Sequence, residues 1–291
     1  MAVLEQILPA SGSHRLPWRL KSVPPRAAVA ASLPLAICLL ALLVPLLHLP
    51  DPTAGSLSQR LLPPGSAGHP LGTDGQGRDL VSRLLWGLRP SLLSGLLPVA
   101  IACLAGSALG LVAGLGAHWL HEVVMRTLDV FYAFPAVLLA IAVAAALGSG
   151  FSNAVIALSI ILVPPIARIA ETEAARLRNA DFMTAARASG ASWVAIVFRQ
   201  VLPNVAPGIV VYCSSLIGLS IIYAAGLSFL GLGVAPPTAE LGLMVNDLRQ
   251  FIFNDPVLLL EPAALILVVA VVFNVMGDSL RGLLDHRVEV I

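Results

Sequence analysis

The chain has 291 residues, of which 58% are hydrophobic and only 11% are charged. Soluble domains carry roughly 25% charged residues, so this composition excludes an ordinary water-soluble domain and indicates a polytopic membrane protein. The formal net charge is +1, which gives no reason to expect a nucleic-acid partner.

Six apolar stretches are long enough to cross a bilayer, because a spanning helix needs about 20 mostly apolar residues. In chain order they are residues 27–47, 91–115, 128–147, 153–169, 208–230 and 258–276. The first is longer than a signal-peptide core and is interpreted as an uncleaved anchor. In the fourth, the Pro164-Pro165 pair is expected to kink or break the helix. The predicted fold class is therefore all-α, a polytopic membrane protein with six transmembrane helices.

Arginine and lysine are distributed unevenly between the loops. With six spans, both termini lie on one side, and 12 of the 17 basic residues fall on that side. Basic residues accumulate in cytoplasmic loops, so both termini are predicted to be cytoplasmic. The loop of 38 residues between the fourth and fifth spans is the longest on that side.

The second span carries small residues at four-residue spacing, namely Ala102, Gly106, Gly110 and Gly114. They form a stripe along one helix face and allow another backbone to approach closely. Packing within the bundle is the favoured interpretation, and a dimerisation face is the alternative.

Two ion pairs are predicted near the ends of spans. Asp129 lies one turn from Arg126, and Asp79 lies one turn from Arg83. Both spacings place the two side chains on one helix face. The segment 71–89 around the second pair is interpreted as a solvated cap that orients the second span, with direct contact to substrate as the alternative.

Motifs for catalysis and for phosphate or metal binding are absent from the sequence. It contains no G-x-x-x-x-G-K-[ST], no H-E-x-x-H and no G-x-S-x-G, and its single lysine precedes the first span. A phosphate-cradling loop needs a lysine at the end of a glycine turn, so ATP hydrolysis by this route is not expected of the chain itself. No catalytic, cofactor-binding or metal-ligating residues are predicted.

The polar loop before the fifth span has local signals for two short helices. Residues 184–189 have high helix propensity, and Gly190 is expected to end that helix. Ser192 is a suitable N-cap for a second helix over 193–201, which Pro203 is expected to stop. The two helices form either a docking corner for a cytoplasmic protein or an amphipathic segment on membrane lipid.

This loop resembles the cytoplasmic EAA loop of binding-protein-dependent ABC importer permeases. The family pattern is E-A-A, three residues, G, nine residues, I, one residue, L-P, and this chain has threonine in place of the glutamate and Gln200 in place of the isoleucine. The residues that the resemblance assigns to the ATPase-coupling loop are Thr184, Ala185, Ala186, Arg187, Gly190, Ala191, Ser192, Trp193, Leu202 and Pro203.

Three further stretches are similar to one subfamily, the second (C-type) permease of dipeptide, oligopeptide and nickel importers. They are HPLGTDGQGRDLVSRLLWGLRPSLLSG at 69–95, GLSFLGLGVAPPTAELGLMVND at 226–247 and NVMGDSLRGLLD at 274–285. These motifs occur in the family's order and spacing, and with the loop they cover most of the chain from residue 69 onward.

The resemblance implies a MetI-like permease fold and a transport subunit without its own ATPase site. Its expected partners are a homologous second permease, two cytoplasmic ATPase subunits that use the ATP, and a periplasmic or lipid-anchored substrate-binding protein. The expected location is the bacterial inner membrane, and the expected cargo is a dipeptide or oligopeptide. Nickel or a metal-chelate is the alternative cargo, since residues 237–253 also resemble nickel-type members. A membrane enzyme or free-standing channel outside this family is the remote alternative.

The domain organisation follows from the spans and the resemblance together. It consists of a cytoplasmic N-terminal segment (1–26), a first transmembrane anchor (27–48), an extracytoplasmic loop (49–90), a MetI-like transmembrane permease domain (91–277) with the cytoplasmic coupling loop 171–207, and a cytoplasmic tail (278–291).

Overall fold

The computed structural model describes residues 25–288, and nearly all of the predicted N-terminal segment 1–26 lies outside the described residues. Helices dominate the described part of the chain. They are α1 (Pro25–Leu43), α2 (Leu80–Leu115), α3 (His118–Tyr132), α4 (Ala136–Leu147), α5 (Phe151–Leu177), α6 (Asp181–Ala188), α7 (Trp193–Ile196), α8 (Leu202–Phe229), α9 (Leu241–Leu248) and α10 (Pro256–Val288).

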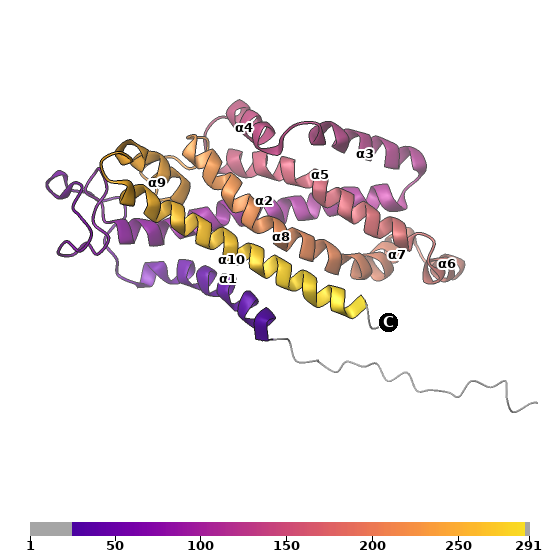
Figure 1. Ribbon diagram of the computed structural model, residues 1–291. Helices are drawn as coiled ribbons and strands as arrows, with labels where there is room; N and C mark the ends of the chain where they lie inside the picture. Colours follow the sequence, from indigo (N-terminus) through magenta and orange to yellow (C-terminus); the bar gives the residue numbers. More distant parts are fainter. Residues whose placement is uncertain (1–24, 289–291) are drawn as a thin grey trace, which may run out of the picture.

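The long helices α1, α2, α5, α8 and α10 run side by side as a bundle (Figure 1). The last residues of α10 and the short helices α6 and α7 lie toward one end, which we call the terminal end (Figure 1). The loop between α1 and α2 lies with α9 at the opposite end, which we call the far end. The loop between α5 and α8 therefore lies at the same end as the last described residues of α10.

Five helical segments are long and apolar enough to cross a membrane, and α3 with α4 supplies a sixth if the bent pair counts as one span. The predicted third span, 128–147, is not a continuous helix: it turns by 91° between α3 and α4. Pro135 sits at the N-cap of α4. A proline disfavours helical backbone at the residue before it, which accounts for the break. In the predicted fourth span the backbone remains helical through Pro164 and Pro165, so the expected break is absent there.

Helix α2 begins eleven residues before the predicted second span, because Asp79 caps it. The Asp79 carboxylate accepts a hydrogen bond from the backbone N–H of Ser82. The helix is 36 residues long, or about 54 Å at 1.5 Å per residue, whereas the hydrocarbon core is about 30 Å thick. Its first turns therefore extend beyond the membrane, within the segment 49–90 that was predicted to be a loop.

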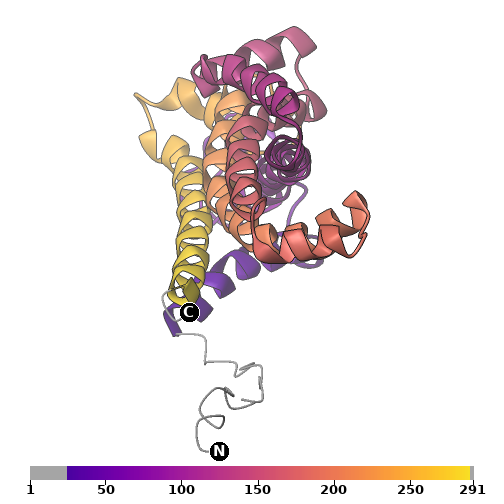
Figure 2. The ribbon, with the colours of Figure 1, turned by 90° about the vertical axis from the view of Figure 1, so that its right-hand side faces the viewer.

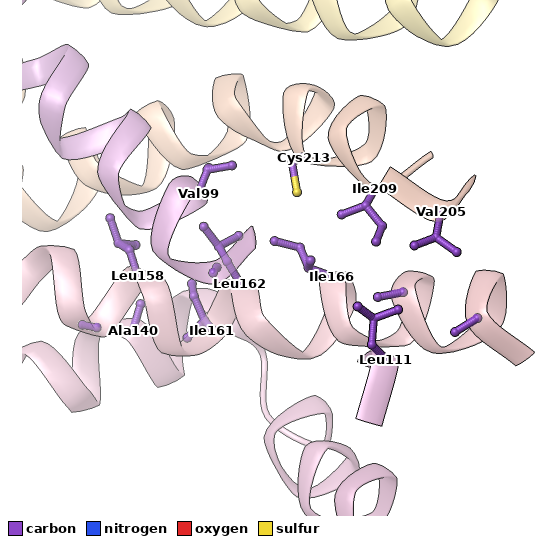
Figure 3. Close-up of a cluster of buried hydrophobic side chains, with 14 of the residues drawn as sticks. Val99, Leu111, Ala140, Leu158, Ile161, Leu162, Ile166, Val205, Ile209 and Cys213 are labelled. Atoms are coloured by element: carbon purple, nitrogen blue, oxygen red, sulfur yellow. The ribbon is translucent and has the colours of Figure 1, made fainter. Parts of the chain in front are cut away.

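The small-residue stripe of α2 packs against α5, as predicted for packing within the bundle. A Cβ added to Gly106 would lie 2.9 Å from the Val163 carbonyl oxygen, and one added to Gly114 would lie 2.8 Å from that of Glu171. Only glycine allows this backbone approach. Around it, α2, α4, α5 and α8 contribute apolar side chains to a shared core (Figure 3).

Candidate functional site

The corner between α6 and α7 has the geometry that its sequence predicts. Helix α6 ends in a Schellman motif, in which the N–H of Gly190 donates to the Arg187 carbonyl and the N–H of Ala191 donates to that of Ala186. Gly190 has φ +77°, a left-handed conformation that costs other residues energy. The Ser192 hydroxyl then caps α7 by accepting from the Ala195 N–H. The predicted corner is confirmed.

Pro203 does not stop the second helix, contrary to the prediction. The backbone passes from α7 through a π-helical turn over Val197–Val201 directly into α8, so that a continuous helix extends from Trp193 to Phe229. Proline removes one hydrogen-bond donor, and a local π turn is one of the adjustments by which a helix accommodates this loss. Helix α7 is therefore mechanically joined to a membrane span.

The coupling segment, which we define as residues 181–203, has one face against the bundle and one face outward. Met183, Ile196 and Val201 are buried. Figure 2 shows α6 and α7 projecting sideways from the bundle. Trp193, three residues before the buried Ile196, is 56% exposed. Apolar residues of α7 point both toward the bundle and away from it, so the segment keeps an apolar surface that no described part of the chain covers.

Most of the predicted coupling residues are exposed on this outward side of the segment. Exposed positions are Thr184, Ala185, Arg187, Gly190, Ala191, Ser192, Trp193 and Pro203, while Ala186 and Leu202 are half-buried. Sequence reasoning missed three apolar members of the same face, Phe182, Val194 and Phe198. The sequence did contain a signal for them: each is apolar but does not follow the helical spacing of the buried residues, so it is expected on the outer side of its helix.

A second polar site, the far-end cluster, consists of Asp74, Arg78, Arg83 and Asp247. Arg78 Nε lies 2.6 Å and Arg83 Nε 3.3 Å from Asp74 Oδ2, and these three side chains are at most 4% exposed. The Nη2 atoms of both arginines lie 3.6–3.7 Å from Oδ2 of Asp247, which is in the last turn of α9. Arg83 Nη1 also donates to the Pro52 carbonyl. The cluster thus joins three segments that are distant in sequence.

Two interpretations of the segment 71–89 are corrected by this geometry. Arg83 pairs with Asp74 and not with Asp79, because Asp79 caps α2 and contacts His69 Nδ1 at 2.9 Å. The cap is buried and not solvated. Asp247 lines the inner wall of a polar cleft of about 300 Å³, together with Arg78 and Phe251.

Glu240 forms a further buried link at the far end. It caps α9 by accepting from the Leu243 N–H, and its other oxygen accepts from the Ser91 hydroxyl of α2 at 2.9 Å. The same hydroxyl accepts from the Leu241 N–H. Burial raises the pKa of the Glu240 carboxyl above its ordinary value, although these hydrogen bonds oppose the rise. One serine therefore fixes α9 to α2.

The ion pair predicted between Arg126 and Asp129 does not form. Instead, Asp129 at the end of α3 accepts a hydrogen bond from Arg168 of α5. The Arg168 guanidinium also lies over the Tyr132 ring, with 4.9 Å between Cζ and the ring centroid. Helix α3 folds back along α5, and this tertiary contact brings the more distant arginine to Asp129.

The sequence matches a known family of membrane proteins. Residues 106–290 match the family described as Binding-protein-dependent transport system inner membrane component. The chain belongs to this family. It is a multi-pass membrane protein and the permease component of an ABC importer.

Several curated permeases are similar over most of their length. Identity is 42% with the glutathione transport system permease protein GsiD of Pectobacterium atrosepticum, over 77% of this chain and 74% of that protein. Identity is 40% with the dipeptide transport system permease protein DppC of Alkalihalophilus pseudofirmus, over 86% of this chain and 82% of that protein. It is also 40% with the probable D,D-dipeptide transport system permease protein DdpC of Escherichia coli, over 94% and 91%.

Solved structures support the fold of this permease. An inward-facing form of the MetNI methionine ABC transporter aligns with a TM-score of 0.58 at 18% identity, covering 70% of this chain and 97% of that one. An amino acid ABC transporter with histidines aligns with a TM-score of 0.52 at 18% identity, covering 71% and 94%. The predicted all-α, MetI-like permease fold is confirmed.

Proposed function

We propose that this permease carries dipeptides or short oligopeptides across the bacterial inner membrane. The similar permeases are named for dipeptide, D,D-dipeptide and glutathione transport, and these cargoes are all small peptides. A second, homologous permease completes the pathway, and a periplasmic or lipid-anchored binding protein delivers the cargo to the far end. Both termini and the coupling segment lie in the cytoplasm, in agreement with the excess of basic residues on that side.

The outward face of the coupling segment is the observation that carries the proposed mechanism. We infer that the corner around Gly190 and Trp193 docks on one of two separate cytoplasmic ATPase subunits. An exposed aromatic anchor on a small-residue corner suits a protein partner, because such anchors concentrate binding energy. ATP binding moves the ATPase pair, and the continuous helix from Trp193 to Phe229 passes that motion to a membrane span.

Co-purification from mild detergent tests the assembly. The chain is expected to retain a second multi-span permease and P-loop ATPase subunits. The assembled transporter is then reconstituted with its binding protein, and ATP-driven uptake of dialanine is compared with uptake of a nickel chelate. Uptake of the nickel chelate alone would overturn the peptide assignment. Isolation of the chain without any ATPase, even after cross-linking, would overturn the importer mechanism.

The docking role of Trp193 is tested with a matched control. Trp193→Ala is expected to weaken ATPase retention by about tenfold or more, since a truncated interface anchor costs about 2 kcal/mol or more. Trp119→Ala removes a tryptophan of similar exposure from α3 and is expected to leave ATPase retention unchanged. Equal retention by both variants would indicate that the coupling segment lies on lipid.

A further inference from the structure

The Asp129–Arg168 pair occupies an unusual position in the permease. Residues 130–167 contain no charged residue and no histidine, so Asp129 and Arg168 flank an uncharged stretch of 38 residues. The fold closes this stretch on itself and brings its two flanking charges into one ion pair between α3 and α5. They are therefore the most deeply placed charges on α3, α4 and α5.

The pair lies at membrane depth and points away from the bundle. Arg168 is 17 residues after Phe151, the first residue of α5, which is about 25 Å along the helix axis and less than the thickness of about 30 Å of the hydrocarbon core. The side chains of Arg168 and Asp129 are nevertheless 49% and 44% exposed. Tyr132, over which the guanidinium lies, is 50% exposed.

Lipid is a poor environment for this surface. Charged side chains within membrane segments face the interior of an assembly or a water-filled cavity, because hydrocarbon does not solvate them. One hydrogen bond joins the two side chains within the described residues, so Asp129 Oδ2 and most of the guanidinium N–H groups remain available on the outward side. The surface therefore offers a hydrogen-bond acceptor with negative charge beside a donor with positive charge.

We propose that Asp129, Tyr132 and Arg168 line the water-filled translocation pathway near its terminal end and contact the charged ends of a passing peptide. This inference rests on the proposed function. The carboxylate of a zwitterionic peptide meets Arg168, and its ammonium group meets Asp129. The tyrosine ring holds the guanidinium in place while the peptide exchanges for the internal ion pair.

Water accessibility tests the lining role independently of transport. Asp129→Cys and Arg168→Cys are made separately in a full-length chain whose native cysteines are replaced by alanine, and the transporter is assembled with its partners. Both thiols are expected to react with a charged, membrane-impermeant methanethiosulfonate at least about tenfold faster than a thiol facing lipid, because the ionised thiolate is the reactive form. Leu104→Cys supplies the lipid-facing reference, since Leu104 is a 76% exposed apolar residue near the middle of the predicted second span, 91–115.

Equal reactivity at all three positions would overturn the lining role, because the pair would then lie against lipid or a protein surface. Failure of the wild-type assembly to drive peptide uptake would instead count against the proposed function. The accessibility result would still report whether the pair meets water.

Neutral variants test contact with the peptide. Arg168→Gln and Asp129→Asn are each expected to lower ATP-driven dialanine uptake about tenfold, as expected for loss of a hydrogen bond to a charged group, with assembly intact. Glu122→Gln removes the charge from the exposed pair with His118 on the same helix as Asp129, and uptake is expected to remain within about twofold of the wild type. Wild-type uptake by both neutral variants would overturn the peptide contact while leaving the lining role to the thiol experiment.

Discussion

The far-end cluster and the coupling segment are both polar stretches next to membrane spans, yet they fold in opposite ways. In the far-end cluster, Asp74 and Arg83 are almost fully buried and form an ion pair with each other. In the coupling segment, the residues around Gly190 and Trp193 remain exposed. Charged groups that pair within the chain form a fixed platform, whereas exposed apolar groups are available to contact another protein or lipid. The comparison therefore separates a structural region of the permease from the region that we propose as a docking surface.

The two regions also differ in how they attach to the spans. At the far end, buried hydrogen bonds from Ser91 and Glu240 fix α9 to α2. In the coupling segment, α6 is held chiefly by Met183 and by the Schellman corner, and α7 continues into α8. Motion of the coupling segment is thus expected to reach α8 directly.

Breaking the far-end cluster has the largest expected effect on stability. Asp74→Ala leaves the guanidinium groups of Arg78 and Arg83 buried without the carboxylate that they share, which costs about 3–5 kcal/mol. The measurement is thermal unfolding of the purified protein in detergent. Asp51→Ala, a change at a fully exposed carboxylate of the same end, is expected to leave the melting temperature unchanged. Similar melting temperatures for the two variants would contradict the structural role of the cluster.

Removing the link between α9 and α2 has the next largest effect. Ser91→Ala leaves a Glu240 oxygen and the Leu241 N–H without their buried partner, at a cost of about 1–3 kcal/mol. Hydrogen exchange of the purified protein is expected to rise in α9 and to remain unchanged in α6. An equal rise of exchange in α9 and α6 of the Ser91→Ala variant would show that the two ends are coupled, and would contradict the distinction between them.

Substitution of Gly190 tests the coupling segment. The space around this residue is open, so a larger side chain meets no obstacle and the expected penalty comes from φ +77° alone, about 1–2 kcal/mol. Gly190→Leu is expected to lower ATP-driven uptake while membrane insertion stays normal.

Gly190→Asn is the matched control for this corner, because asparagine adopts left-handed backbone more readily than leucine. It is expected to retain more uptake than the leucine variant. Normal uptake by a correctly inserted Gly190→Leu protein would contradict the transmission of motion through the corner.

The smallest expected effect is a pH dependence at the far end. Since burial raises the pKa of Glu240, its folded state binds a proton more tightly than its unfolded state. Its contribution to stability is fully present below the ordinary carboxyl pKa and is lost as the pH rises through the raised value. Glu240→Gln removes this titration, so its melting temperature is expected to fall less than that of the wild type as the pH rises from about 4.5. Parallel pH profiles would contradict the raised pKa.

Local signals in the sequence predicted individual elements with different success. The Gly190 corner and the Ser192 cap depend on neighbouring residues only, and both were predicted correctly. The start of α2 was missed because Arg83 and Arg89 interrupt the apolar pattern, whereas a buried ion pair compensates the first of them. Pro203 was expected to stop a helix, but a π turn before it lets the helix continue although proline has no N–H to donate. Predictions thus failed where a distant contact compensated a charge in an apolar pattern, or where an adjusted backbone compensated the missing N–H of a proline.

Hydropathy, glycine spacing and turn chemistry by themselves determined the five long apolar helices, the small-residue face along which α2 allows another backbone to approach, and the corner of the coupling segment. These features depend on the backbone and on residues a few positions apart. Tertiary structure alone decided that Arg83 pairs with Asp74, that Arg168 pairs with Asp129, and which aromatic side chains remain outside. The physical reason is that the partner of a charged side chain or an apolar face depends on which helices pack against it. Those helices are distant in sequence, so local patterns do not identify the partner.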